Sequence, residues 1–348
     1  MKLSLSPMLT TTATVAAALL LPLSLSVESP APDNLPTSIA IAPSEQVTIA
    51  LRSATAQIFT QPVAKLTHPA PSPASAVNPG RLTNLSILTT LTDATDTFTI
   101  GAVVGGASTI GPKPLLVRAA GPSLTALGVT DVVNDPKLEV FTGATKVGEN
   151  DDWGGDPATV AAMDRVGAFA FSSPLSRDAA ISLPALARGA SSARISGTGA
   201  GTVLAELYDA STADAFLATT PRLTKVWILK NIGAGVTAGF VIGGNTERTV
   251  LIRAIGPTME TLFGIEGAIA DPRLALYSGQ TQLAANDNWG GDPTLAAISA
   301  RSGAFPLPAK SRDAALLLTL QPGAYTLNVA GTDGLSGIAL IEIYEVPE

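Results

Sequence analysis

The chain contains no cysteine and a single histidine, His68, among its 348 residues. The absence of cysteine excludes disulfides, thiol nucleophiles and cysteine-ligated zinc sites. Because His68 lies in a Pro-rich stretch near the N-terminus, the remainder of the chain has no imidazole for a Ser-His-Asp triad. No Gly-x-Ser-x-Gly elbow and no Walker loop occurs either. These absences favour a protein that is not an enzyme.

Aromatic and charged residues are also scarce, at 5% and 14%, whereas hydrophobic residues make up 46%. Any core must therefore be built from Val, Ile, Leu and Ala. The net charge is −7 and Lys and Arg do not cluster, so the basic surface that nucleic-acid binding requires is missing. The 32 glycines and 26 prolines separate short aliphatic runs, a pattern that predicts an all-β fold.

The N-terminus has the features of a secretory signal. Lys2 precedes an apolar run at residues 13–23, and small residues follow it up to Ser26. We interpret residues 1–26 as a signal peptide and expect a secreted, periplasmic or cell-surface protein. The apolar run is too short for an ordinary membrane-spanning helix, and Pro22 interrupts it, so we expect no transmembrane helix after cleavage.

Residues 27–80 are rich in Pro, Ala and Ser, including the stretch Pro-Ala-Pro-Ser-Pro-Ala-Ser at 69–75. Such a composition buries too little apolar surface to order itself, so it predicts a mostly disordered linker. Residues 46–60 hold a more apolar island that can form a strand pair.

An eight-residue motif occurs twice and reveals a duplication. Residues 150–157 read Asn-Asp-Asp-Trp-Gly-Gly-Asp-Pro, and residues 286–293 differ from them at one position. Other matching blocks appear in the same order, which indicates a repeated module. They include Leu-Val-Arg-Ala-Ala-Gly-Pro-Ser with Leu-Ile-Arg-Ala-Ile-Gly-Pro-Thr, and Ser-Arg-Asp-Ala-Ala in both halves. We define copy one as 81–209, copy two as 222–348, and the linker as 210–221.

Most blocks are short runs of β-branched or aliphatic residues bounded by Gly, Pro, Asn or Asp, and they predict seven or eight strands per copy. One short helix per copy is also expected, because Asp156-Pro157 and Asp292-Pro293 each supply an N-cap acid and a Pro at the first helical position. The predicted fold is two tandem antiparallel β-sandwich modules, jelly-roll-like, each with one short helix that closes an end.

The motif set Arg-Ala-x-Gly-Pro-Ser/Thr, Asn-Asp-x-Trp-Gly-Gly-Asp-Pro, Ser-Arg-Asp-Ala-Ala and Gly-Ala-Tyr-Thr-x-x-Val resembles a repeat of secreted multidomain proteins from environmental bacteria. It is similar, more loosely, to the C-terminal β-sandwich domains attached to secreted peptidases. The resemblance covers nearly all of residues 81–346. It implies an exported, non-catalytic β module.

Oxygen ligands gather in the repeated Asn-Asp-x-Trp loop, and calcium prefers several such oxygens on a flexible loop. The candidate ligands are Asn150, Asp151, Asp152 and Asp156 in copy one, and Asn286, Asp287 and Asp292 in copy two. The alternative is turn chemistry, in which Asn and Asp bond to nearby backbone and the last Asp caps a helix. The spacing is not that of an EF-hand, and turn chemistry explains most of the pattern without calcium.

Trp153 and Trp289 occupy the same loops. Exposed indoles would form platforms for stacking on sugars, whereas buried indoles would seal one end of each core. The usual burial of Trp favours sealing over the ligand platform.

Charged residues also stand inside apolar strands. Arg118 and Glu206 in copy one match Arg253 and Glu342 in copy two. Because a buried charge requires a partner, we predict an Arg–carboxylate pair inside each copy. A ligand-binding arginine is the alternative. Further pairing candidates are Arg177 with Asp178 and Arg312 with Asp313.

The sequence thus predicts an exported, non-catalytic binding or structural protein of the cell surface or envelope. Polysaccharide and another surface protein are the candidate partners, and nucleic acid is not. The alternative is a carbohydrate-active hydrolase that uses paired carboxylates. Nothing singles out such a pair, and the duplication of every acidic motif argues for structural roles.

Overall fold

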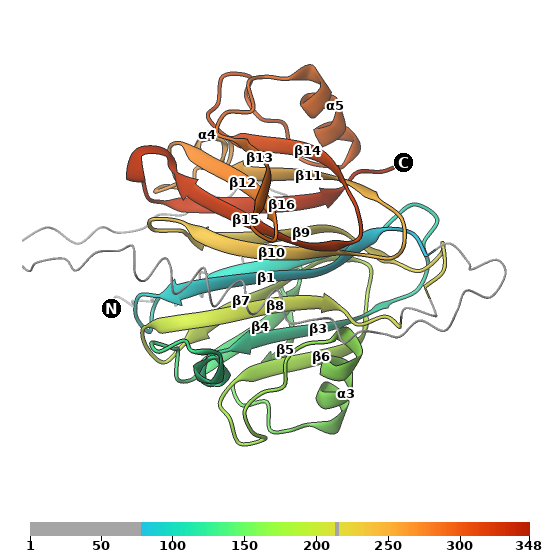
Figure 1. The fold of residues 1–348 in the computed structure, drawn as a ribbon, viewed down its shortest axis with the longest axis vertical. Coiled ribbons are helices and arrows are strands. Elements are labelled where there is room, and N and C mark those ends of the chain that lie inside the picture. The colour runs from blue at the N-terminus through green and yellow to red at the C-terminus, as the bar shows by residue number, and fades with distance from the viewer. Residues whose placement is uncertain (1–77, 213–215) are drawn as a thin grey trace, which may run out of the picture.

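The computed structural model describes residues 78–212 and 216–348. The expected signal peptide and the strand pair at 46–60 lie outside the described residues. Sixteen strands form two antiparallel eight-stranded sheets that pack as a sandwich, which confirms the all-β prediction (Figure 1). Within the described part of the chain, no helix has the length and apolar character needed to cross a membrane.

Each copy contributes eight strands. Those of copy one are β1 (Arg81–Leu91), β2 (Phe98–Gly105), β3 (Lys113–Ala120), β4 (Pro136–Thr142), β5 (Thr145–Asn150), β6 (Ala179–Leu186), β7 (Gly189–Gly197) and β8 (Gly201–Asp209). Those of copy two are β9 (Arg222–Asn231), β10 (Val236–Gly243), β11 (Arg248–Ile255), β12 (Pro272–Ser278), β13 (Thr281–Asn286), β14 (Ala314–Leu320), β15 (Gly323–Gly331) and β16 (Ile338–Glu345).

The two sheets run without interruption from one copy into the other. Sheet A has the order β13-β12-β15-β10-β1-β8-β3-β6, and sheet B has the order β14-β11-β16-β9-β2-β7-β4-β5. The first strand of each copy therefore pairs with the second strand of the other copy, as β1 with β10 and β9 with β2. Each copy supplies four strands to each sheet, so each eight-stranded sheet contains strands of both copies. We call these two cross-copy pairings the seam.

Inward-facing aliphatic side chains from both copies build one continuous core. Alternate residues of β2, such as Ile100 and Ala102, are fully buried, as the period-2 geometry of a strand requires. Val226 and Ile228 of the neighbouring β9 belong to the same cluster although they come from copy two. Burial of apolar area across the seam thus stabilises both copies together.

The two expected helices are present at opposite ends of the long axis (Figure 1). They are α3 (Pro157–Val166) and α5 (Pro293–Arg301), and the Asp156 and Asp292 side chains cap them by accepting from backbone N–H groups of the first turn. Each copy also has a second helical turn that we did not predict, η1 (Pro122–Leu127) or α4 (Pro257–Phe263). Both begin at the Pro of the Gly-Pro-Ser/Thr block, where a preset φ favours a helical start. A short 3₁₀ turn, η3 (Thr332–Gly334), precedes β16.

The seam is tightly packed at one glycine. Gly101 of β2 lies opposite Trp227 of β9, and a Cβ at position 101 would overlap the Trp227 indole. The indole is buried, at 5% exposed, so it cannot swing into solvent without losing its packing. Glycine at 101 therefore leaves room for the Trp227 indole to pack against β2 across the seam.

We expect Gly101→Ala to lower the free energy of unfolding by about 1–3 kcal/mol, because the added methyl overpacks the seam. Urea unfolding of the single variants, and of Gly101→Ala combined with Trp227→Phe, measures the coupling between the two positions. The double variant should cost less than the sum of the single ones. Strict additivity would show that this contact does not hold the copies together.

Candidate functional site

The repeated Asn-Asp-x-Trp loop ties the edge strands of the two sheets together. Asn150 is the last residue of β5, at the edge of sheet B, and its Oδ1 accepts from the backbone N–H of Ala180 on β6, at the edge of sheet A, at 2.9 Å. Its Nδ2 donates to the Asp152 carbonyl, also at 2.9 Å. In copy two, Asn286 accepts from the Ala315 N–H at 2.9 Å. The same motif therefore closes both ends of the sandwich.

Both tryptophans of the motif are buried, Trp153 at 8% and Trp289 at 6% exposed. The Trp153 Nε1 donates to the Ser173 carbonyl at 3.0 Å, and the ring meets Phe171 edge-on with centroids 5.3 Å apart. The Trp289 Nε1 donates to the Pro308 carbonyl at 3.0 Å. Both indoles are thus buried with their polar atoms bonded inside the protein, and Trp153 packs in an apolar cluster with Met163 of α3 and Phe171, apart from the core between the sheets.

The aspartate of the Ser-Arg-Asp block is the most fully bonded acid of the site. Asp178 is completely buried, and its Oδ1 accepts from the backbone N–H groups of Gly121 at 2.7 Å and Ser123 at 3.2 Å. Its Oδ2 accepts from the hydroxyls of Ser123 and Ser176. The carboxylate therefore joins the Ser-Arg-Asp block to the Gly-Pro-Ser block.

Copy two repeats this arrangement. Asp313 is fully buried and accepts from the N–H groups of Gly256 at 2.8 Å and Thr258 at 3.3 Å, and from the Thr258 hydroxyl. Sequence reasoning missed the role of both aspartates. One signal in the sequence could have indicated it: the bonded Gly and Asp are separated by the same 57 residues in both copies.

The arginine beside each of these aspartates bonds elsewhere. Arg177 pairs with Asp135, and Arg312 pairs with Asp271, each with 3.2 Å between Nη1 and Oδ2. The suggested pairing within the Arg-Asp dipeptide is therefore wrong for both copies. Adjacent residues alternate in direction along an extended chain, so the Asp turns inward while the Arg remains exposed.

The predicted buried Arg–Glu pair is confirmed in each copy. Arg118 Nη1 lies 3.6 Å from Glu206 Oε2, and Arg253 Nη2 lies 2.8 Å from Glu342 Oε2. Arg253 also donates from Nε to the same oxygen at 3.0 Å. Phenylalanine rings cover both guanidinium groups, 4.3 Å from Phe171 in copy one and 4.3 Å from Phe305 in copy two. These arginines are enclosed by the protein rather than directed toward a ligand.

The charge state of the copy-two pair follows from its surroundings. Burial acts to raise the pKa of Glu342, but Arg253, Lys225 and the Tyr344 hydroxyl more than compensate and hold that pKa below its usual range. Burial, with the Glu342 charge beside it, raises the pKa of the Tyr344 hydroxyl. Glu342 is therefore a carboxylate and Tyr344 a neutral donor near neutral pH, and neither is poised for proton transfer.

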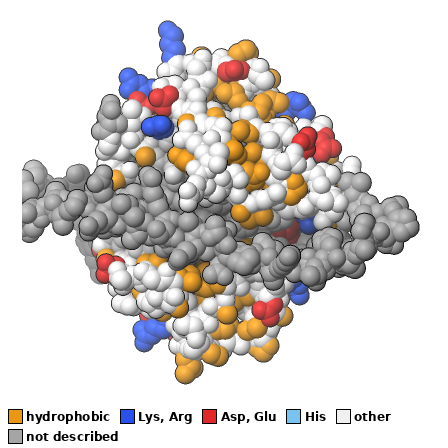
Figure 2. Space-filling view, in the orientation of Figure 1, with side chains coloured by type: hydrophobic (Ala, Val, Ile, Leu, Met, Phe, Trp, Pro, Cys, Tyr) orange, Lys and Arg blue, Asp and Glu red, His pale blue; other side chains and the backbone are white. Residues whose placement is uncertain are grey.

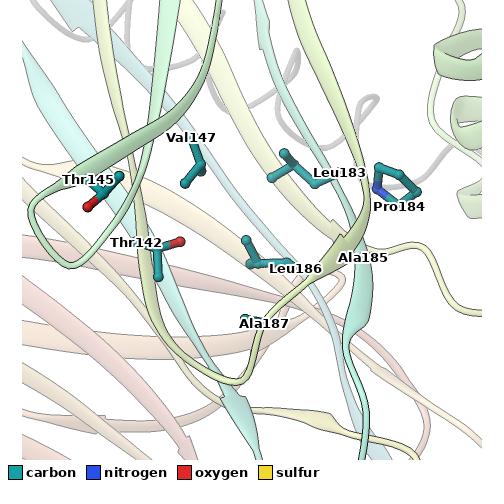
Figure 3. Close-up of a pocket in the computed structure, with 8 residues that line it drawn as sticks. All are labelled: Thr142, Thr145, Val147, Leu183, Pro184, Ala185, Leu186 and Ala187. Atoms are coloured by element: carbon teal, nitrogen blue, oxygen red, sulfur yellow. The ribbon is translucent and has the colours of Figure 1, made fainter.

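A hollow of about 500 Å³ opens at the outer end of copy one, between the β4–β5 and β6–β7 turns (Figure 3). Val147, Leu183 and Leu186 supply apolar walls, and Thr142 and Thr145 supply hydroxyls. None of the described residues that line it is charged. The hollow thus offers apolar contact but no acid, base or nucleophile with a shifted pKa.

The structure uses the predicted metal ligands in other ways. The Asn150 and Asn286 carbonyl oxygens accept from strand N–H groups, and Asp156 and Asp292 cap helices. The remaining candidates, Asp151, Asp152 and Asp287, are exposed. Across residues 78–212 and 216–348, no three His, Asp or Glu side chains group closely enough to hold a metal ion. This donor set does not fit a calcium site.

No family model and no curated protein matches the chain. Among solved structures, the VP2 subviral particle of infectious bursal disease virus is similar over 84% of this chain and 77% of the viral chain, with 9% identity and a TM-score of 0.17. A TM-score this low carries no argument about fold or function.

We expect Asp178→Ala to lower the free energy of unfolding by about 3 kcal/mol, since it leaves two buried N–H groups without an acceptor. Asp313→Ala should have a similar effect at the other end of the sandwich. The exposed Asp151 is the matched control, and Asp151→Ala should change stability by less than about 0.5 kcal/mol. Chemical denaturation measures the free energy of unfolding of all three variants. Equal effects of Asp178→Ala and Asp151→Ala would contradict the stabilising role assigned to the Asp178 hydrogen bonds.

We further expect the melting temperature to be the same in millimolar calcium and in chelator. The stabilisation by a ligand grows with the ratio of its concentration to its dissociation constant, and calcium should bind weakly here because the Asn150 and Asp156 oxygens are already bonded. Differential scanning fluorimetry of the protein tests this. A rise of several degrees in the melting temperature with calcium would show instead that the protein binds the ion, and would favour the loops as the metal sites.

Proposed function

We propose that the protein is an exported, non-catalytic β-sandwich that serves as a structural or binding element of the cell surface or envelope. One observation carries the proposal. The distinctive residues of the repeated motifs form the same internal ties in both copies, from the Asn150 and Asn286 bridges to the buried Asp178 and Asp313 carboxylates. Motifs used in this way maintain a rigid body. Export rests on the sequence of residues 1–26.

The buried acids support a non-catalytic role. A glycoside hydrolase needs two carboxyl groups that face each other across an open substrate site. Glu206 and Glu342 are instead enclosed with Arg118 and Arg253. Glu139 is held by Arg194 and Lys146. The observations therefore favour the structural or binding role over the hydrolase.

A protein partner is better supported than a polysaccharide. Sugar binding through stacked aromatic rings would need exposed faces, and Trp153 and Trp289 are buried. Apolar side chains are exposed instead, among them Leu175 at 92% and Ile110 at 71%. On the face seen in Figure 2, the described charged side chains lie scattered among apolar and uncharged ones, which suits contacts with a protein surface. Calcium is not part of the proposal.

We expect the purified protein to release no reducing ends from cellulose, chitin or peptidoglycan, and not to be depleted from solution by them. Reducing-sugar assays and pull-down with the insoluble polymer measure the two quantities. A heat-unfolded sample is the control for contaminating activity and for non-specific adsorption. Release of sugar above that control would favour the hydrolase, and specific depletion would favour polysaccharide as the partner.

Export has a separate readout. The mature protein, isolated from the non-cytoplasmic fractions, should begin at Val27 when its N-terminal peptide is sequenced by mass spectrometry. If only the uncleaved chain were recovered, and only from the cytoplasm, the proposed export would be wrong. The results of the polysaccharide assays would not be affected.

A further inference from the structure

The two sheets end in four edge strands, β13 and β6 in sheet A and β14 and β5 in sheet B. An edge strand presents unpaired backbone N–H and C=O groups, which proteins usually blunt with bulges, charges or proline. Register shifts interrupt the pairing of β13, β5 and β6 with their neighbours. By contrast, β14 pairs with β11 in unbroken register from Ala314 to Leu320. It is therefore the one regular edge among these four.

The equivalent edge of copy one shows what β14 lacks. Strand β6 carries Pro184 and a bulge, whereas β14 has Thr319 at the corresponding place. A proline has no N–H to offer an added strand. Strand β14 reads Ala-Ala-Leu-Leu-Leu-Thr-Leu and contains neither proline nor charge. Its residues 316–318 are half-buried and Thr319 is exposed, so this part of the strand reaches the surface.

The direction of the backbone groups can be read from one hydrogen bond. The Ala315 N–H bonds to the Asn286 side chain, which lies on the side away from β11. Because N–H groups alternate along a strand, those of Leu317 and Thr319 point the same way. Within the described chain, no hydrogen bond from either of these two N–H groups is found. The Leu317 side chain packs with Leu295 and Ile298 of α5, which holds the strand in place.

We propose that β14 is a dimerisation edge, at which a second copy of this chain adds its own β14 in antiparallel orientation. A two-fold axis through Leu318 satisfies the outward groups of Leu317 and Thr319 on both sides. Each Leu317 N–H donates to the partner's Thr319 carbonyl, and each Thr319 N–H donates to the partner's Leu317 carbonyl. Ala315 takes no part in this pairing, so its N–H keeps its bond to Asn286.

Several features favour a second copy over another strand. Self-pairing places Leu318 opposite its own copy and Leu316 opposite Leu320, and it brings no like charges together, because β14 has none. The chain already joins its two copies by antiparallel pairing of their strands at the seam. A two-fold contact at one edge closes as a dimer, and the blunted edges β5, β6 and β13 do not extend it into a fibre. The inference does not depend on the proposed function.

The test is sedimentation equilibrium of the full chain over a concentration series up to several hundred micromolar, since one strand pair makes a small and weak interface. The mean mass should rise from 35.2 kDa toward twice that value. Thr319→Pro, which installs the residue of copy one, removes two hydrogen bonds per dimer and should weaken association about ten-fold or more. Pro184→Ala is the matched control on β6 and should leave the dimer unchanged.

A second variant and a second readout separate loss of pairing from loss of fold. Thr319→Lys puts a charge on the exposed edge without removing the N–H, and it too should shift the mass toward the monomer while circular dichroism stays native. Hydrogen exchange at the Leu317 and Thr319 amides should slow as the concentration rises. A monomer at every concentration would overturn the proposal. So would a dimer that both natively folded variants retain, or whose formation leaves these two amides exchanging at the same rate.

Discussion

Backbone pairing across the seam, β1 with β10 and β9 with β2, is the constraint on which the rest of this structure depends. It makes each sheet half of one copy and half of the other, so neither copy contains a complete sheet. The apolar faces of both copies are then buried in a single core. The seam also decides where the other elements lie, because it places β5 and β6 of copy one, and β13 and β14 of copy two, with their loops, at opposite ends of the molecule (Figure 1).

The ends of the sandwich pose a different physical problem from its centre. In the centre, aliphatic side chains interlock and hydrogen bonds run between strands. At an end, two edge strands from different sheets must be joined and the loops that follow them must be held against the sheets. In copy one Asn150 joins the strands, and Trp153 and Asp178 hold the loops, each with its polar atoms bonded inside the protein. Two equivalent ends require two equivalent sets of ties, which explains why these motifs recur with so little change.

Local chemistry in the sequence predicted local structure. An Asp followed by Pro predicted the caps of α3 and α5, and the need to pair buried charge predicted Arg118 with Glu206. The order of strands was not predictable, because pairing between β1 and β10 joins residues far apart in the chain and leaves no local pattern. Asp178 was misread for a related reason. Its partners are backbone N–H groups, which every residue carries, so no residue type announces them.

A duplicated chain contains its own control, because each position has a counterpart that faces the same structural demand. Where the counterparts agree, as at the two buried aspartates, the fold accounts for the residue. Where they differ, the fold permits a choice and another constraint has made it. Two such differences lie toward the outer ends. Copy one has Pro184 and a bulge where copy two has Thr319, and it has Phe171 where copy two has Leu307. The same hydrogen bonds therefore hold both ends together, whereas the residues at these differing positions give each end its own properties.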